Sequence, residues 1–177
     1  MKMSLIALVA AAAIALPALA NPYLDAGRSA ARAEIAKLKL AGRWVGAGWI
    51  DVPQVGRMEI RSEETVVERL GGSALMIEGL HRDSKTNAVV HNALGLLSWD
   101  AGAKEYRMAT ALDFGRGGYF PGRLEGNRFT WAIDMPGGMK QRYAIVVEGD
   151  RWVETGERSR DGAAWEPFFH MELSRIK

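Results

Sequence analysis

The chain has 177 residues, of which 48% are hydrophobic and 25% charged, and its formal net charge is +2 at pH 7. Because it contains no cysteine, the sequence excludes disulfide bonds, thiolate catalysis, cysteine-ligated zinc and iron–sulfur clusters. Its charges are scattered and form no basic run, so we expect neither nucleic acid nor an anionic membrane surface as a partner.

Residues 1–20 have the pattern of a secretory signal peptide. Lys2 supplies a positive charge, residues 5–16 form an uninterrupted apolar run, and Ala18 and Ala20 suit the small-residue cleavage site. The run is too short to span a bilayer, and no cysteine follows it that would carry a lipid. We therefore expect cleavage after Ala20, no membrane span in the mature chain, and a periplasmic or secreted location.

Residues 21–41 are predicted to contain one N-terminal helix, over residues 22–40. Apolar side chains recur on one of its faces and polar residues occupy most other positions. The members of this apolar face are Leu24, Ala31, Ile35 and Leu38. The pattern leaves two placements open: the helix packs on the outside or rim of the domain, or it forms a lid over the mouth of a barrel.

From Gly42 onward, short β-type runs alternate with turn residues about every eight to twelve positions, which is typical of an all-β domain. Ten strands are predicted, at residues 43–51, 56–69, 73–82, 87–99, 104–113, 117–125, 128–134, 139–148, 151–160 and 165–176. No linker or long-period repeat interrupts them. We therefore predict that residues 42–177 form one domain.

Three two-residue turns predict which residues face each other: Gly126-Asn127, Gly149-Asp150 and Asp161-Gly162. The first pairs Leu124 with Phe129. The second pairs Ile145 with Glu154, and the third pairs Glu154 with Phe169. These registers gather apolar residues on one face, namely Phe120, Leu124, Phe129, Trp131, Ile133, Tyr143, Ile145, Val147, Trp152, Phe169, Met171 and Leu173. We predict a single antiparallel up-and-down β-barrel with this face inside, because closure removes the sheet edges.

The segment Gly42-Arg43-Trp44 resembles the Gly-x-Trp signature that opens the first strand of lipocalins and other calycins. The resemblance implies that Trp44 plugs one end of the barrel and that Arg175, on the last strand, stacks across it. Over residues 42–175 the chain also resembles exported bacterial lipocalin-like proteins of unknown function, in patterns such as Gly72-x-x-Leu75-x-Ile77-Glu78-Gly79. This likeness implies a lipocalin-like barrel fold and assigns no catalytic residue to the chain.

The longer pattern Gly42-x-Trp44-x-Gly46-x-Gly48 resembles the opening of nitrobindin-type haem barrels. That resemblance implies a haem-ligating histidine near the C-terminus, and His170 is the candidate. By the predicted register, however, His170 points away from the face of Phe169 and Met171. We therefore expect no cofactor, with haem as the alternative.

Glu154 is the most informative candidate for a binding residue, because the predicted register places it on the apolar inner face. A carboxyl group there must be paired, hydrogen-bonded or protonated. Arg158 and Tyr143 are predicted on the same face, and Trp131 and Phe169 would form the wall around them. Two interpretations stay open: a satisfied Glu–Arg–Tyr network, or a polar anchor for a ligand in an apolar pocket.

Glu78, His91 and Arg107 are predicted as a second polar group in the binding site. A four-residue turn over residues 83–86 would place Glu78 opposite His91, whereas a five-residue turn would turn Glu78 to the other face. His81, beside this turn, is expected to be solvated. The histidines lack metal-ligand spacing and Ser73 lacks a nucleophile elbow, so we expect no metal and no serine catalysis.

Three functions follow from this pattern. The first is a barrel that binds a small apolar or amphipathic ligand in its interior. The second is an enzyme that uses an internal carboxyl group, Glu154 or Glu78, as general acid or base. The third is a filled barrel that binds another protein through its surface. A cavity of roughly 300 Å3 or more would support the first two, and a solid interior the third.

The cleavage site leads to a direct test. We expect N-terminal sequencing of the exported protein to begin at Asn21, because Ala18 and Ala20 fit the small pockets of signal peptidase. Exported material that still carries Met1 would contradict this expectation.

Overall fold

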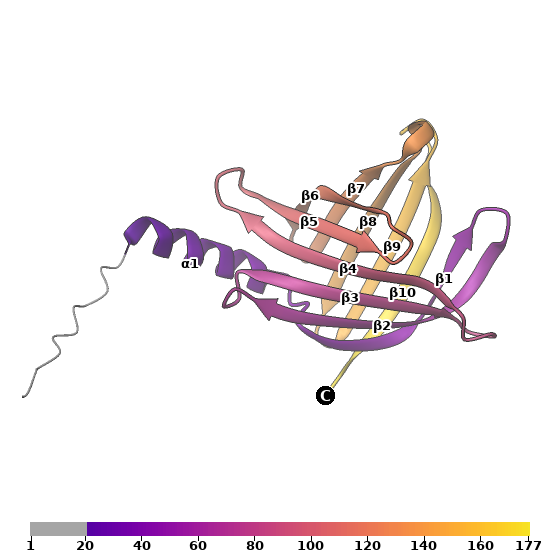
Figure 1. Ribbon diagram of the computed structural model, residues 1–177, viewed down its shortest axis with the longest axis horizontal. Coiled ribbons are helices and arrows are strands. Elements are labelled where there is room, and N and C mark those ends of the chain that lie inside the picture. Colours follow the sequence, from indigo (N-terminus) through magenta and orange to yellow (C-terminus); the bar gives the residue numbers. More distant parts are fainter. Residues whose placement is uncertain (1–20) are drawn as a thin grey trace, which may run out of the picture.

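The computed structural model describes residues 21–177, so the predicted signal peptide lies outside the described residues. Turn residues divide the described chain into one helix followed by ten strands (Figure 1). Their bounds are α1 (Pro22–Lys37), β1 (Gly42–Val52), β2 (Gly56–Arg69), β3 (Ala74–Asp83), β4 (Val89–Asp100), β5 (Glu105–Leu112), β6 (Gly117–Glu125), β7 (Arg128–Asp134), β8 (Lys140–Glu148), β9 (Arg151–Ser159) and β10 (Glu166–Ile176), with a 3-10 turn, η1 (Pro136–Gly138), before β8. The predicted strands are confirmed within two residues at each end.

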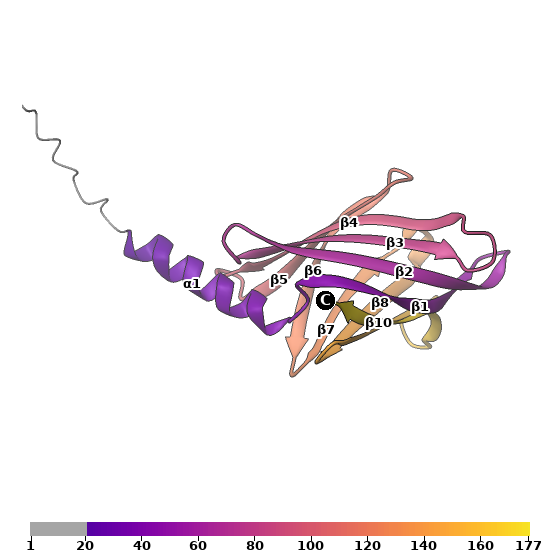
Figure 2. The ribbon, with the colours of Figure 1, turned by 90° about the horizontal axis from the view of Figure 1, so that it is seen from below.

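The ten strands form a closed antiparallel barrel in which each strand pairs with its neighbours in the chain and β1 pairs with β10. This confirms the predicted all-β, up-and-down barrel preceded by one helix. Figure 1 and Figure 2 show that β2–β5 cross the direction of β7–β10, so the barrel has two walls. The interior between these walls contains the core.

The two hairpins with short turns have the predicted register. Leu124 faces Phe129, and Ile145 faces Glu154. Gly126 and Gly149 have the positive φ angles, 62° and 61°, that these turns require. The sequence therefore defined both the pairing and the inward face of these strands.

The predicted register between β9 and β10 is wrong. Asp161 and Gly162 do not form a two-residue turn, because the Asp161 side chain accepts hydrogen bonds from the backbone N–H groups of Ala163 and Ala164 and widens the loop. As a result Glu154 faces Met171 instead of Phe169.

The inward face of β10 was nevertheless predicted correctly. The wider loop shifts β10 by one residue, which alone would turn its apolar residues to solvent. A β-bulge between Pro167 and Phe169 adds a second one-residue shift and restores the alternation. Both Phe168 and Phe169 are buried at this bulge.

Trp44 closes one end of the barrel. Its side chain is fully buried, and its indole N–H donates a 2.8 Å hydrogen bond to the Leu40 carbonyl. The Arg175 guanidinium carbon lies 4.0 Å from the centroid of the ring. Arg175 also donates to the Lys39 carbonyl at 2.9 Å and to the Asp150 carboxylate at 3.1 Å. The contact that the calycin resemblance implied is therefore present.

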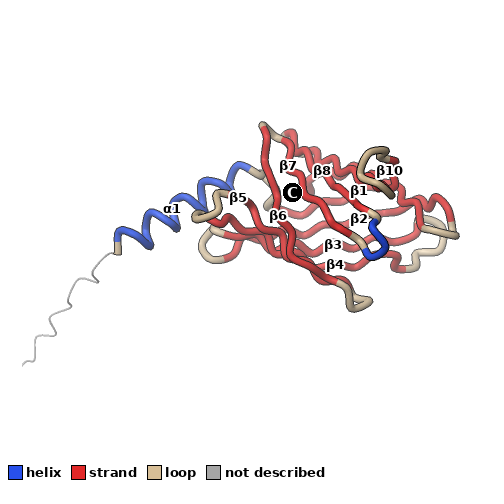
Figure 3. The backbone as a smooth tube through the Cα atoms, turned by 90° about the horizontal axis from the view of Figure 1, so that it is seen from above, coloured by secondary structure: helices blue, strands red, loops and turns tan. Residues whose placement is uncertain are grey.

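The helix α1 packs at this closed end and is not a lid over the opposite mouth. Ile35 and Leu38 are buried in the core cluster, and the Tyr106 hydroxyl donates to the Glu34 carbonyl at 3.1 Å. The N-terminal part of α1 projects away from the barrel (Figure 3). The helix ends before the predicted residue 40, since Leu38 caps it and Lys39 has a φ of 56°. Within residues 21–177, no helix has the length and hydropathy needed to span a membrane.

Gly46 and Gly48 let β1 and β10 approach each other closely. A Cβ atom on Gly46 would overlap the backbone carbonyl of Glu172, and one on Gly48 would overlap that of His170. The Gly-x-Gly pattern after Trp44 is thus explained by the closure of the barrel.

The plug at the closed end has a measurable consequence. We expect Trp44→Ala to lower the free energy of unfolding by about 3–5 kcal/mol, the range for removal of a large buried aromatic residue. Arg175→Ala should lower it less, because the Arg175 side chain is 24% exposed whereas the Trp44 ring is fully buried. Denaturant unfolding measures both, with Trp49→Ala as the control because Trp49 is only half-buried, stacked against His170 and Arg57. Equal, negligible losses for Trp44→Ala and Arg175→Ala would contradict this role.

Candidate functional site

A cavity of about 220 Å3 lies inside the barrel. Most of its surface is apolar, and both walls of the barrel contribute residues to it. Representative apolar residues are Ile77, Met108, Trp131, Ile145, Phe169 and Met171. The interior is therefore not solid, although the cavity lies below the roughly 300 Å3 typical of sites for drug-sized ligands.

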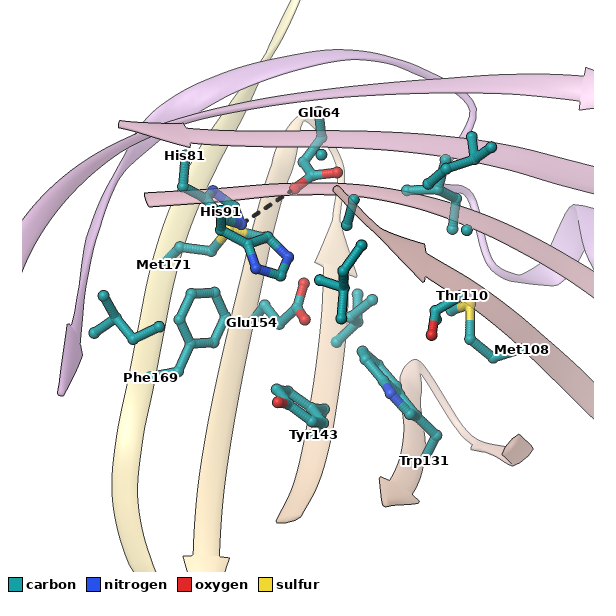
Figure 4. A pocket seen from close by; sticks show the side chains of 18 of the residues that line it. Glu64, His81, His91, Met108, Thr110, Trp131, Tyr143, Glu154, Phe169 and Met171 are labelled. Atoms are coloured by element: carbon teal, nitrogen blue, oxygen red, sulfur yellow. Dashed lines mark ion pairs between the residues drawn. The ribbon is translucent and has the colours of Figure 1, made fainter. Parts of the chain in front are cut away.

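Glu154 projects into this cavity from β9, between Ile145 on β8 and Met171 on β10 (Figure 4). Its side chain is buried, and among residues 21–177 it forms no hydrogen bond of normal geometry and no ion pair. Burial raises the pKa of the Glu154 carboxyl group to about 8, and the nearby Trp152 indole opposes this shift in part. The Trp152 N–H itself is buried without a hydrogen-bond partner. Glu154 is thus largely protonated at neutral pH.

A second carboxyl group, Glu64 on β2, faces the same cavity. Glu64 is buried opposite Gly79, where a Cβ atom would lie 2.7 Å from Oε1 of the carboxyl group. Glycine at position 79 therefore makes the room that the Glu64 carboxyl group occupies. Burial, together with the charge of Glu154, raises the pKa of Glu64 well above its ordinary value. The sequence did not single out Glu64, because Glu63 and Glu64 are adjacent in β2 and point to opposite faces, and no short turn indicates which of the two faces the interior.

His81 and His91 complete the polar part of the cavity. Their rings stack with centroids 5.0 Å apart, and His81 Nδ1 lies 2.8 Å from the Ser62 hydroxyl. His81 Nε2 lies 3.8 Å from Glu64 Oε1. Burial and the proximity of His91 lower the pKa of His81 to about 3, and burial also lowers that of His91, so both rings are neutral.

The expectation that His81 is solvated is wrong. Ile77, Gly79 and His81 alternate along β3 and face the interior, and His81 lies opposite Ser62. The period-two pattern from Ile77 onward was the signal that would have placed His81 inside.

Glu78 and Arg107 do not contribute to the cavity. The loop after β3 extends to residue 88, so His91 faces His81, and Glu78 faces Leu94 on the exposed outer side. Arg107 also points outward, where it forms ion pairs with Glu105 and Asp100. Of the second predicted group, only His91 lines the cavity.

The predicted network of Glu154, Arg158 and Tyr143 does not form. Arg158 donates to the Asp51 carbonyl at 3.4 Å, and the Tyr143 hydroxyl donates to the Gln141 side chain at 3.1 Å. Tyr143 still lines the cavity, as do the predicted Trp131 and Phe169. Burial and the charge of Glu154 raise the pKa of Tyr143, which stays protonated.

The histidine that the nitrobindin resemblance implied as a haem ligand does not line the cavity. His170 points to the outer face, where its ring stacks on Trp49 with centroids 6.4 Å apart. The cavity is also smaller than usual cofactor pockets. Among residues 21–177 there is no group of three or more histidine, aspartate or glutamate side chains arranged to hold a metal ion.

The fold and the interior cavity define a lipocalin-like barrel. No family model and no curated protein sequence matches the chain. Several solved structures share the fold, and two of them are similar over most of their length. The first, Rv2717c from M. tuberculosis, has a TM-score of 0.61 and 15% identity, over 83% of this chain and 98% of that chain. The second, the S-type phycobiliprotein lyase CPES from Guillardia theta, has a TM-score of 0.56 and 8% identity, over 85% of this chain and 97% of that chain.

The buried carboxyl and imidazole groups give stability a defined pH dependence. The folded state keeps a proton on Glu154 that the unfolded chain releases, so a rise in pH toward about 8 favours unfolding. His81 acts in the opposite direction below about pH 6.5, because the unfolded imidazole takes up a proton that the buried ring does not. We therefore expect the free energy of unfolding to decrease as the pH rises from about 6.5 to about 8.

Glu154→Gln should remove part of this decrease, on the order of 2 kcal/mol, since one pKa unit corresponds to about 1.4 kcal/mol. Glu64 remains in the variant and contributes a decrease in the same direction. Urea unfolding at a series of pH values measures the effect, and Glu78→Gln on the outer face is the matched control. An unchanged pH dependence in Glu154→Gln would show that Glu154 is ionised in the folded protein.

Proposed function

We propose that this protein binds a small molecule with an apolar body inside the barrel, and that the buried Glu154 carboxyl group anchors it. The observation that supports the proposal is a carboxyl group that faces an apolar cavity without a hydrogen bond or ion pair from residues 21–177. A buried polar group without a partner is unfavourable, and a ligand with a complementary group would satisfy it.

The interior also argues against a barrel that acts through its surface alone. A filled barrel needs no internal carboxyl groups, and apolar residues at positions 64 and 154 would pack there at lower free energy. The shared fold with a phycobiliprotein lyase is consistent with a barrel that handles a small ligand. Together with the signal-peptide pattern of residues 1–20, this leads us to propose an exported binding protein, periplasmic or secreted.

Native mass spectrometry of protein purified from its own exported fraction tests this function. We expect the wild-type protein to retain a small-molecule adduct, and Glu154→Gln to lose it. Because the Glu154 carboxyl group forms no hydrogen bond of normal geometry and no ion pair among residues 21–177, Glu154→Gln should keep a melting temperature equal to or above that of the ligand-free wild type.

Glu78→Gln is the control, since it makes the same chemical change on the outer face. It should retain the adduct. A wild-type protein without any adduct, or an adduct that survives in Glu154→Gln, would contradict the proposed anchor.

A further inference from the structure

We infer that the ligand is a compact organic cation, an amine on an apolar body, whose ammonium group lies between the carboxyl groups of Glu154 and Glu64. The inference rests on the proposed binding function and names its ligand class. It follows from the charge, the aromatic wall and the size of the cavity.

The cavity contains two carboxyl groups, and the two histidines that share it, His81 and His91, are neutral. Glu154 enters from β9 and Glu64 from β2, and Figure 4 shows both carboxyl groups directed into the cavity. Within the described part of the chain, no lysine or arginine lines it. An anionic ligand would therefore lack a charged partner, whereas an ammonium group would gain charge-assisted hydrogen bonds from the two acids.

Aromatic rings line the wall beside Glu154. Trp131 and Tyr143 stack with centroids 5.0 Å apart and planes at 11°, and Phe168 meets Tyr143 edge-on at 5.7 Å. The face of an aromatic ring attracts a cation, and proteins use aromatic rings in this way to recognise quaternary ammonium ligands. The same rings would also pack against an apolar body.

The volume limits the ligand to a compact molecule. At about 220 Å3, the cavity exceeds the roughly 150 Å3 in which an apolar protein cavity binds benzene, and it is below the range for drug-sized ligands. A single substituted ring or a short branched chain would fit.

Binding of a cation would be coupled to proton release. The titratable groups that face Glu154 are Glu64 on β2, His81 on β3, His91 on β4 and Tyr143 on β8. Burial raises the pKa of the Glu64 carboxyl group and of the Tyr143 hydroxyl and lowers the pKa of both imidazoles, so it disfavours charge at each of them. The ammonium group keeps its proton, and the Glu154 carboxylic acid releases its own to solvent as the ion pair forms. Affinity for an amine should therefore rise with pH up to about 8, where the free carboxyl group ionises.

Three probes of matched shape and different charge test the inference: benzylamine, benzyl alcohol and benzoate. We expect isothermal titration calorimetry at pH 7 to show benzylamine binding about tenfold or more tightly than benzyl alcohol, since charge-assisted hydrogen bonds are roughly twice as strong as neutral ones. Benzoate should bind weakest. Titrations in two buffers of different ionisation enthalpy should detect a proton released with benzylamine and none with benzyl alcohol.

Two variants distinguish the contribution of the Glu154 charge to binding from that of the shape of the cavity. Glu154→Gln should weaken benzylamine about tenfold and leave benzyl alcohol within about twofold, because the amide keeps the shape but not the charge. Glu78→Gln should change neither. If benzyl alcohol or benzoate binds as tightly as benzylamine, the cation inference is wrong and the proposed binding function stands. If none of the three binds to the wild type, both are wrong.

Discussion

The pairing of β1 with β10 is the constraint on which the rest of the structure depends. An open sheet of ten strands would expose the unpaired backbone groups of two edge strands. Closure pairs these groups with each other, and successive side chains of every strand then point alternately to the interior and to solvent. Closure requires Gly46 and Gly48, because side chains there would overlap the backbone of β10. The same pairing places Trp44 opposite Arg175, so the strands that close the barrel also cap one of its ends.

Closure at one end leaves an interior in which polar groups are held away from water. Ser62 satisfies one nitrogen of His81, but the carboxyl groups of Glu64 and Glu154 receive no comparable hydrogen bond from residues 21–177. Burial raises the pKa of both groups and so favours their neutral forms, because a buried charge carries a large desolvation penalty. A neutral acid in an apolar cavity is well suited to exchange its proton for a cationic partner.

The candidate site exists only in the assembled barrel. Its histidines and Glu64 come from the wall of β2–β4, whereas Glu154 and the aromatic rings come from the wall of β7–β10. No short segment carries both halves. The relative position of the two walls is set by the closed end and by the β-bulge in β10, which returns Phe169 and Met171 to the interior. Packing at these distant points therefore positions the binding groups.

The sequence by itself determined the ten strands, the closed barrel and the inward direction of Glu154, since local turns and two-residue alternation carry that information. It also indicated the contact of Trp44 with Arg175 through a short signature. It did not determine that Glu64 and His81 face the cavity, that Glu78 and Arg107 face outward, or that Arg158 lies apart from Glu154. Those positions depend on the lengths of the loops and on one β-bulge, because a register shift of one residue moves every side chain of a strand to the opposite face of the sheet. Only the tertiary structure, in which closure selects a single set of registers, decided them.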